Sequence, residues 1–200
     1  MDIKIVRLFI SLPVPETYRD AFGEWQHECI RRHEEVTGQL RWTQREQLHL
    51  TARFLGDVDD QRISALEQAF ATVCRVTPPF ELIFEKLVYA PPAARSFSMI
   101  WALFQDSEPL RIFSDAIAVS CREMFSEDRV TVKELIPHIT LARINISSQN
   151  FGRHAGNISL NQPPISELFP AASCTLMQSV RDISGEHTYH PLKNFQLGGR

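Results

Sequence analysis

With 200 residues, 44% of them hydrophobic, the chain is long enough for one domain with a sizeable core or for two small lobes that share one. A formal net charge of −3 excludes a generally basic protein that coats nucleic acid, although a local basic site for an RNA end or a nucleotide is still compatible with it. Charged residues interrupt the first seven positions, which argues against a signal peptide and a membrane span, so we expect a cytoplasmic protein. The four cysteines have no zinc-type spacing and are expected to be buried and reduced: Cys29, Cys74, Cys121 and Cys174.

The first half of the chain is predicted to alternate between strands and helices. Apolar alternation predicts strands over residues 6–12 and 48–55. Apolar stripes at helical spacing predict a helix after each strand, the first from about Glu16 and the second capped by Asp59 or Asp60. In the second strand one face should be apolar and pack on the core, and the other should be polar: Leu48, Leu50, Ala52 and Phe54 against His49, Thr51 and Arg53.

The second half is predicted to be richer in hairpins. Strands are expected over residues 80–89, 97–104, 138–146, 174–181 and 188–197, with a third helix capped by Asp106 or Ser107 and a long polar loop over 147–164. Because strands and helices intermix without strict βα alternation, we predict an α+β fold with antiparallel sheets and helices on the outer faces. The two halves are loosely self-similar, so residues 1–200 are expected to form one domain with two related lobes.

One tetrapeptide pattern occurs twice, as His49-Leu50-Thr51-Ala52 and His138-Ile139-Thr140-Leu141. Each copy lies in a predicted strand, in which residues i and i+2 point to the same side. Each strand should therefore pack its apolar residues on the core and present one histidine and one threonine on the other face. If the two strands face a common groove, that groove contains two imidazoles and two hydroxyls.

Such a set suits acid–base chemistry at a phosphate. An imidazole with a pKa of about 6.5 is available in both protonation states near neutral pH, so one histidine can accept a proton while the other donates one. Threonine hydroxyls can donate hydrogen bonds to the nonbridging phosphate oxygens. The competing interpretations are histidines without a catalytic role and a zinc site, but no His, Cys, Asp or Glu stands at a convincing spacing to supply a third zinc ligand. His187 and His190 should point to opposite faces of a strand, which disfavours metal binding there as well.

The flanking residues make the resemblance specific. The chain resembles the two-histidine (2H) phosphoesterase superfamily, and within it the RNA 2′,3′-cyclic phosphodiesterases, also called 2′-5′ RNA ligases. The matching segments span nearly the whole chain in the expected order: Arg7 to Pro13, Arg41 to Thr43, Gln47 to Gly56, Pro137 to Arg143 and Tyr189 to Leu197.

The resemblance implies a bilobal fold in which two antiparallel sheets face a central cleft. It also implies hydrolysis of a terminal 2′,3′-cyclic phosphate to a 2′-phosphate, without a metal or another cofactor, and a possible ATP-independent reverse ligation. On the family pattern His49 is the proton donor to the leaving oxygen and His138 is the proton acceptor that activates water. Thr51, Thr140 and Arg143 would bind the phosphate.

Four residues bear on how well the chain fits this pattern. Ala52 stands where the family usually has a larger apolar residue, which concerns core packing. Arg143 falls by alternation on the face of Ile139 and Leu141, so a twist, bulge or strand end after Ala142 has to redirect it. Otherwise Arg53, on the face of His49, is the better phosphate ligand. Phe9 is a candidate for stacking on a base, with core packing as the alternative.

Three functions are weighed. The first is a metal-independent cyclic phosphodiesterase acting on RNA ends, and the second applies the same chemistry to a small cyclic nucleotide or a 2′-5′-linked oligonucleotide. The third is a noncatalytic module that binds RNA ends or nucleotides, which the intact histidines and threonines disfavour. The loops over 91–96 and 147–164 are expected to set substrate choice. We expect a monomer without membrane association.

Overall fold

The protein has an α+β structure, and its described residues form one large antiparallel sheet, one small sheet and three helices. The computed structural model describes residues 4–33, 38, 40–91, 98–122, 135–144, 160–181, 183 and 187–198. The helices are α1 (Glu16–Arg32), α3 (Ile63–Val76) and α4 (Glu108–Arg122), with short 3₁₀ turns at Arg45–Gln47 and Asp60–Arg62. The strands are β1 (Ile5–Pro13), β2 (Leu40–Trp42), β3 (His49–Asp59), β4 (Phe80–Leu82), β5 (Phe84–Ala90), β6 (Met99–Phe104), β7 (His138–Ile144), β8 (Phe169–Ala171), β9 (Ser173–Arg181) and β10 (His187–Gln196).

Eight strands form a single hydrogen-bonded sheet in the order β10-β9-β1-β3-β7-β6-β5, with β2 also paired to β7, and β4 and β8 form a small second sheet. All the strand pairs recorded among the described residues are antiparallel. The resemblance implied two antiparallel sheets facing each other, whereas both motif strands belong to the one large sheet. The strands that carry the two tetrapeptides pair with each other through Leu50 and Ile139 and so join the two halves. This contact is non-local, and apolar alternation within each strand gives no sign of it.

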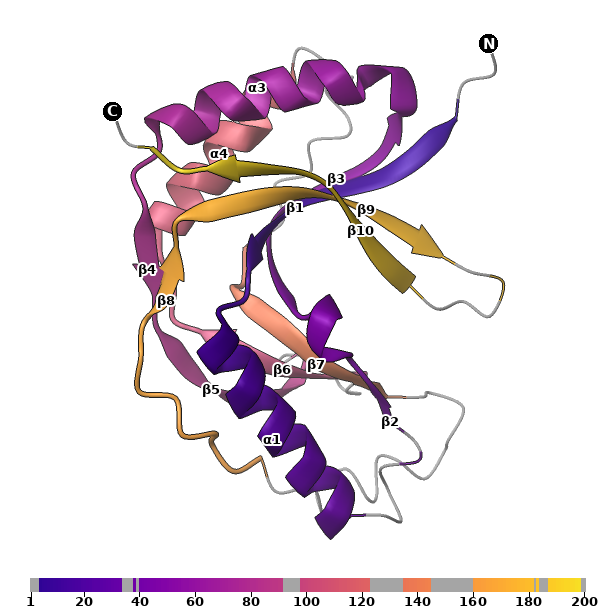
Figure 1. Cartoon of the computed structure of the whole chain (residues 1–200), viewed down its shortest axis with the longest axis vertical. Helices are drawn as coiled ribbons and strands as arrows, with labels where there is room; N and C mark the ends of the chain where they lie inside the picture. The colour runs from indigo at the N-terminus through magenta and orange to yellow at the C-terminus, as the bar shows by residue number, and fades with distance from the viewer. Residues whose placement is uncertain are drawn as a thin grey trace.

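The helices cover different parts of this sheet. Figure 1 shows α3 and α4 together at one end, beside the half that contains β1, β3, β9 and β10, and α1 at the other end, beside β5, β6 and β7. Helix α1 packs through aromatic residues: Phe22 lies edge-on to Phe84 of β5 at 6.0 Å, and Tyr18 stacks on Phe104 of β6 at 6.0 Å. Tyr18 and Phe22 are fully buried, and each buried ring of this size stabilises the fold by roughly 1.5–3 kcal/mol.

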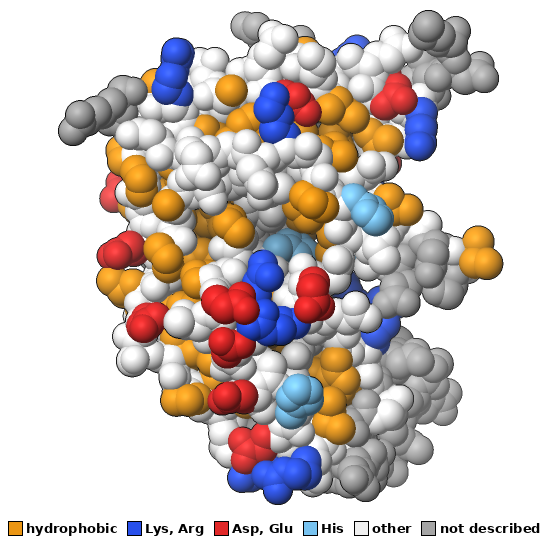
Figure 2. Space-filling model, viewed as in Figure 1, with side chains coloured by type: hydrophobic (Ala, Val, Ile, Leu, Met, Phe, Trp, Pro, Cys, Tyr) orange, Lys and Arg blue, Asp and Glu red, His pale blue; other side chains and the backbone are white. Residues whose placement is uncertain are grey.

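The expected strands and helices are confirmed where the structure describes them, except that the strand expected over 80–89 is two strands, β4 and β5, in different sheets. The predicted loop over 147–164 and the turn over 91–96 lie mostly outside the described residues, and residues 160–164 contain neither helix nor strand. All four cysteines are buried and unbridged, with the Sγ atoms of Cys74 and Cys174 3.4 Å apart. Among the helices that the structure describes, none combines the length and the apolar character needed to cross a membrane. Acidic and basic side chains lie interspersed on the face shown in Figure 2.

Candidate active site

The two tetrapeptides meet at one cross-strand pair. Leu50 of β3 lies opposite Ile139 of β7, and both side chains are completely buried. In an antiparallel pair, the residues on either side of the paired ones point to the opposite face. The four polar residues of the motifs therefore surround this pair on the face away from the core, and all four are half-buried: His49, Thr51, His138 and Thr140. The expectation that each strand presents histidine and threonine on one face agrees with this geometry.

The two imidazoles are held in the same way. Nδ1 of His49 lies 2.8 Å from the carbonyl oxygen of Gln47, and Nδ1 of His138 lies 2.8 Å from that of Ile136. A carbonyl oxygen can only accept a hydrogen bond, so Nδ1 carries a hydrogen in both rings. Nε2 is then the nitrogen at which each ring can accept or donate a proton. The same backbone contact thus leaves Nε2 free for proton transfer in both His49 and His138.

Burial lowers the pKa of both histidines below the usual value. The hydrogen bonds from Nδ1 to the carbonyl oxygens act in the other direction, and nearby positive charge lowers the pKa values further. That charge comes from Arg143 for both rings, and from His138 in addition for His49. Two imidazoles and one guanidinium therefore share one electrostatic neighbourhood, which favours a bound anion.

Aromatic rings fix the orientation of both imidazoles. The ring of Tyr189 in β10 lies edge-on to His49 with centroids 4.6 Å apart, and that of Phe9 in β1 lies 5.0 Å away. Trp101 of β6 stacks on His138 at 3.7 Å with only 20° between the ring planes. Alternation in the sequence identifies Trp101 and Tyr189 as strand residues, but it does not indicate that they contact the histidines.

Arg143 reaches the site through a β-bulge. Trp101 of β6 pairs with Thr140, and the preceding Ile100 pairs with Ala142, so Leu141 is an extra residue in β7. A bulge shifts the alternation by one position and brings Arg143 to the face of Thr140. The irregularity that the sequence required is thus present, one residue earlier than expected.

The bulge is held by helix α1. The carbonyl oxygen of Leu141 accepts a hydrogen bond from the backbone N–H of Thr43 at 2.9 Å and another from the side-chain amide of Gln26 at 2.9 Å. Gln26 is buried, and its amide also donates to the carbonyl oxygen of Thr43 at 3.1 Å. An amide in an otherwise apolar stripe of α1 was the available signal for this contact, and sequence reasoning did not use it.

A second bulge removes Arg53 from the site. Ile10 of β1 pairs with Arg53 and Ser11 with Thr51, so Ala52 is an extra residue in β3. The side chain of Arg53 is only 11% exposed, and its Nη1 lies 4.0 Å from Oδ1 of Asp115 in α4. The expectation that Arg53 shares a face with His49 is wrong because the bulge reverses the alternation after Thr51.

The same shift moves Phe54 away from the core. Phe54 was expected on the apolar face, but it is 69% exposed and lies 5.9 Å from the ring of Phe9. Phe9 itself is only 1% exposed and contacts His49, Phe54 and Tyr189. Of the two interpretations of Phe9, packing fits this environment, because these three rings enclose the side chain on which a base would have to stack.

Comparison with known proteins finds similarity to one family. The model of the LigT-like phosphoesterases matches residues 12–101, a segment that includes His49. An RNA 2′,3′-cyclic phosphodiesterase of Thermotoga maritima is 25% identical over 161 residues, which are 80% of each chain. One of Methanocaldococcus jannaschii is 22% identical over 139 residues, which are 70% of this chain and 72% of the relative.

The chain is similar to the LigT-like phosphoesterases. The resemblance noted in the sequence is thereby confirmed. Among solved structures, Escherichia coli LigT complexed with phosphate superimposes with a TM-score of 0.68 at 21% identity, covering 98% of this chain and 99% of that one. The protein TT0787 of Thermus thermophilus gives a TM-score of 0.75 at 24% identity, with 96% and 98% covered. These structures share the fold of this chain. E. coli LigT has also been crystallised in complex with 3′-AMP.

Metal-ligating side chains are not clustered in the described part of this LigT-like chain: no three His, Cys, Asp or Glu residues there could hold a metal ion together. His187 accepts or donates a hydrogen bond through Nδ1 to Ser179 Oγ at 3.1 Å, whereas Nε2 of His190 lies 3.2 Å from Thr188 Oγ1. The two histidines therefore point to opposite faces of β10, as expected.

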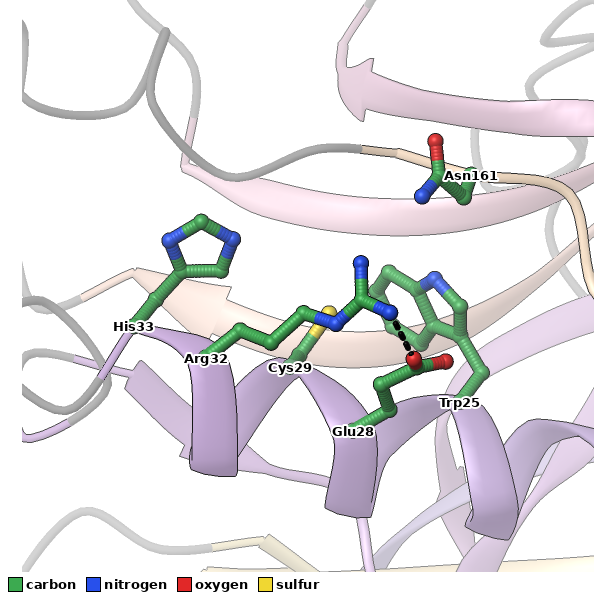
Figure 3. A pocket seen from close by; sticks show the side chains of 6 residues that line it. All are labelled: Trp25, Glu28, Cys29, Arg32, His33 and Asn161. Carbon is green, nitrogen blue, oxygen red and sulfur yellow. Dashed lines mark ion pairs between the residues drawn. The ribbon is translucent and has the colours of Figure 1, made fainter.

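A separate small pocket lies along α1, and no motif residue lines it (Figure 3). Its lining residues are Trp25, Glu28, Cys29, Arg32, His33 and Asn161. Glu28 and Arg32 neutralise each other in an ion pair at 2.5 Å, and burial raises the pKa of Cys29 to about 11. A thiol that stays protonated at neutral pH is a poor nucleophile.

Proposed function

We propose that the protein hydrolyses the 2′,3′-cyclic phosphate at an RNA end to a 2′-phosphomonoester, without a metal, through His49 and His138. The observation that carries the proposal is the cluster of two histidines and two threonines around the Leu50–Ile139 pair, with Arg143 added to the same face by the bulge at Leu141. The names of the relatives point to the same substrate class.

In the proposed reaction, Nε2 of His138 accepts a proton from water as the water oxygen attacks phosphorus. The bond between phosphorus and the 3′-oxygen breaks, and Nε2–H of His49 donates its proton to that leaving oxygen. One water is thereby added across the phosphodiester, leaving a 2′-phosphate and a 3′-hydroxyl. Each proton transfer of this kind typically contributes on the order of 10²–10⁴-fold in rate.

In the proposal, hydrogen-bond donors on the same face stabilise the charge that develops on the nonbridging oxygens. Thr51 and Thr140 donate hydroxyl hydrogens, and the guanidinium of Arg143 adds charge-assisted hydrogen bonds. His138 becomes an imidazolium in this step, and the stacked face of Trp101 favours that cation. The assignment of His138 as the base is consistent with this contact and otherwise follows the family pattern.

The proposal includes a two-lobed arrangement. The RNA end lies between the half built from β1, β3, β9 and β10 and the half built from β5, β6 and β7, with one histidine supplied by each half. The link between β3 and β7 is then the floor of the binding site. Support comes from the single recorded pair between these strands, which leaves the two halves otherwise unpaired along the described residues.

The test is hydrolysis of a short RNA that ends in a 2′,3′-cyclic phosphate, with EDTA present and the product identified by mass and by phosphatase sensitivity. We expect a 2′-phosphate from the unaltered protein and loss of turnover in His49→Ala and His138→Ala. Arg75→Gln on the exposed end of α3 is the matched control, and thermal melting verifies that each variant is folded. Complete inhibition by EDTA would overturn the metal-free reaction, and unchanged turnover in both histidine variants would overturn the acid–base pair.

A further inference from the structure

Besides Arg143, further arginines lie near the proposed catalytic histidines His49 and His138. Arg41 of β2 stands directly opposite Arg143 of β7 in the sheet register. Like charges opposite each other across strands are destabilising. A bound anion removes that penalty, because each guanidinium can then donate to its oxygens. The pair therefore favours an anion more strongly than Arg143 alone does.

Two further arginines, Arg7 of β1 and Arg181 of β9, lie on the other half of the sheet. On β10, His187 is two positions from Tyr189, the residue that contacts His49, and therefore points to the same face. His187 stands opposite Arg181 of β9 and bonds the hydroxyl of Ser179. Ser179 in turn stands opposite Arg7 of β1. Arg7 and Arg181 thus share the face that leads to His49.

The two pairs belong to one electrostatic region. Burial lowers the pKa of His187 the most. The positive charges of four arginines lower it further, and they are Arg143, Arg181, Arg7 and Arg41. Within the part of the chain that the structure describes, Arg7 has an ion pair with Asp57 at 3.9 Å, whereas Arg41, Arg143 and Arg181 have no carboxylate within 4.0 Å. Because the whole chain carries a net charge of −3, this concentration of positive charge is local.

We propose that Arg7, Arg41 and Arg181 bind phosphates of single-stranded RNA upstream of the cyclic end. The protein then binds an oligonucleotide more tightly than a mononucleotide and is selective for the ends of RNA strands. This inference rests on the proposed function for the position of the cyclic end at His49 and His138. Positively charged grooves that follow the backbone are a general means of binding single-stranded nucleic acid without reading its sequence.

The test begins with binding, which does not depend on turnover. A fluorescein-labelled RNA hexamer that ends in a 2′-phosphate is titrated by anisotropy at several salt concentrations. For Arg41→Gln and Arg181→Gln we expect the slope of log K against log salt to fall by about 0.7 for each arginine, because each phosphate contact to a single strand releases counterions in that proportion. The dissociation constant should rise roughly fivefold per variant, as expected for an exposed charge pair. Arg75→Gln should match the unaltered protein.

Kinetics and a competitor distinguish the possible outcomes. The ratio of kcat/KM for the cyclic-phosphate hexamer to that for a nucleoside 2′,3′-cyclic phosphate should fall in Arg41→Gln and Arg181→Gln. If the salt slopes equal that of Arg75→Gln, the inference is overturned even if both substrates are hydrolysed. If neither substrate is hydrolysed but the slopes fall as expected, the proposed function fails and the RNA-binding surface stands. If these variants weaken ATP binding as much as hexamer binding, the arginines bind mononucleotide phosphates and the RNA inference is wrong.

Discussion

Arg143 and Arg53 offer a matched pair for testing the site, since each is the first arginine after its motif threonine. For Arg143→Gln we expect kcat/KM to fall by about 10- to 150-fold, because a charge-assisted hydrogen bond contributes roughly 1.5–3 kcal/mol and each 1.4 kcal/mol is tenfold. A second effect should accompany the loss. The charge of Arg143 lowers the pKa of both His49 and His138, so its removal should raise both pKa values and move the pH profile to higher pH.

For Arg53→Gln we expect turnover within about twofold of the unaltered protein, because the Arg53 guanidinium lies beside Asp115 of α4. Its cost should appear in the free energy of unfolding, at about 1 kcal/mol or less for the ion pair, since Asp115 is 72% exposed. The assay is steady-state hydrolysis of a cyclic-phosphate oligonucleotide over about pH 5 to 8, where imidazoles titrate, combined with NMR titration of the histidine rings. Equal losses in the two variants would contradict the placement of Arg53. A large loss in Arg143→Gln with unmoved histidine pKa values would contradict the shared electrostatic neighbourhood.

Three further outcomes follow from the same contacts. Because burial lowers the pKa of both His49 and His138, the bell-shaped pH profile of kcat/KM should peak below about pH 6.5. The pH profile of kcat should lie at higher pH, because a bound phosphate anion favours the protonated rings. Coincident profiles of kcat and kcat/KM would contradict this. The free energy of unfolding should be greatest above about pH 6.5 and fall as the pH drops toward the lowered folded-state pKa values, because the unfolded chain binds these protons first. The slope is up to about 1.4 kcal/mol per pH unit for each histidine, and denaturation of the His49→Asn/His138→Asn variant at several pH values should lack the part that these two histidines contribute. Trp101→Leu should lower kcat by about 2- to 30-fold with little change in KM, since the ring face stabilises an imidazolium by roughly 0.5–2 kcal/mol. The control variant Trp42→Leu should affect thermal stability alone. The reverse pattern in steady-state kinetics would refute the role of the stacking between Trp101 and His138.

Local patterns were sufficient to predict much of this molecule. Alternation located the strands that carry His49 and His138, and it placed each histidine on the same face as its threonine, because a period of two is a property of one strand alone. The direct pairing of these strands through Leu50 and Ile139 depends on contacts between segments 89 positions apart, and no local pattern contains that information.

The contacts of Trp101, Tyr189 and Arg41 could not be predicted from the sequence for a related reason. Trp101 and Tyr189 are ordinary apolar strand residues by sequence, and their roles come only from the register of β6 against β7 and of β10 against β9. No strand is predicted around Arg41, and only the pairing of β2 with β7 places it opposite Arg143. Register between distant strands is therefore the information that the sequence pattern lacked at this site.

The two bulges explain why counting positions failed for both arginines. Arg53 follows Thr51 by two residues and should share its face, while Arg143 follows Thr140 by three and should not. In each strand the residue directly after the threonine is the extra one, Ala52 in β3 and Leu141 in β7, so the alternation reverses at the same position of both motifs. The reversal turns the arginine at even spacing away from the face of the histidine pair and brings the arginine at odd spacing onto that face. A repeated motif with a repeated bulge thus yields an asymmetric site, in which the half that carries His138 alone supplies the guanidinium next to the histidine pair.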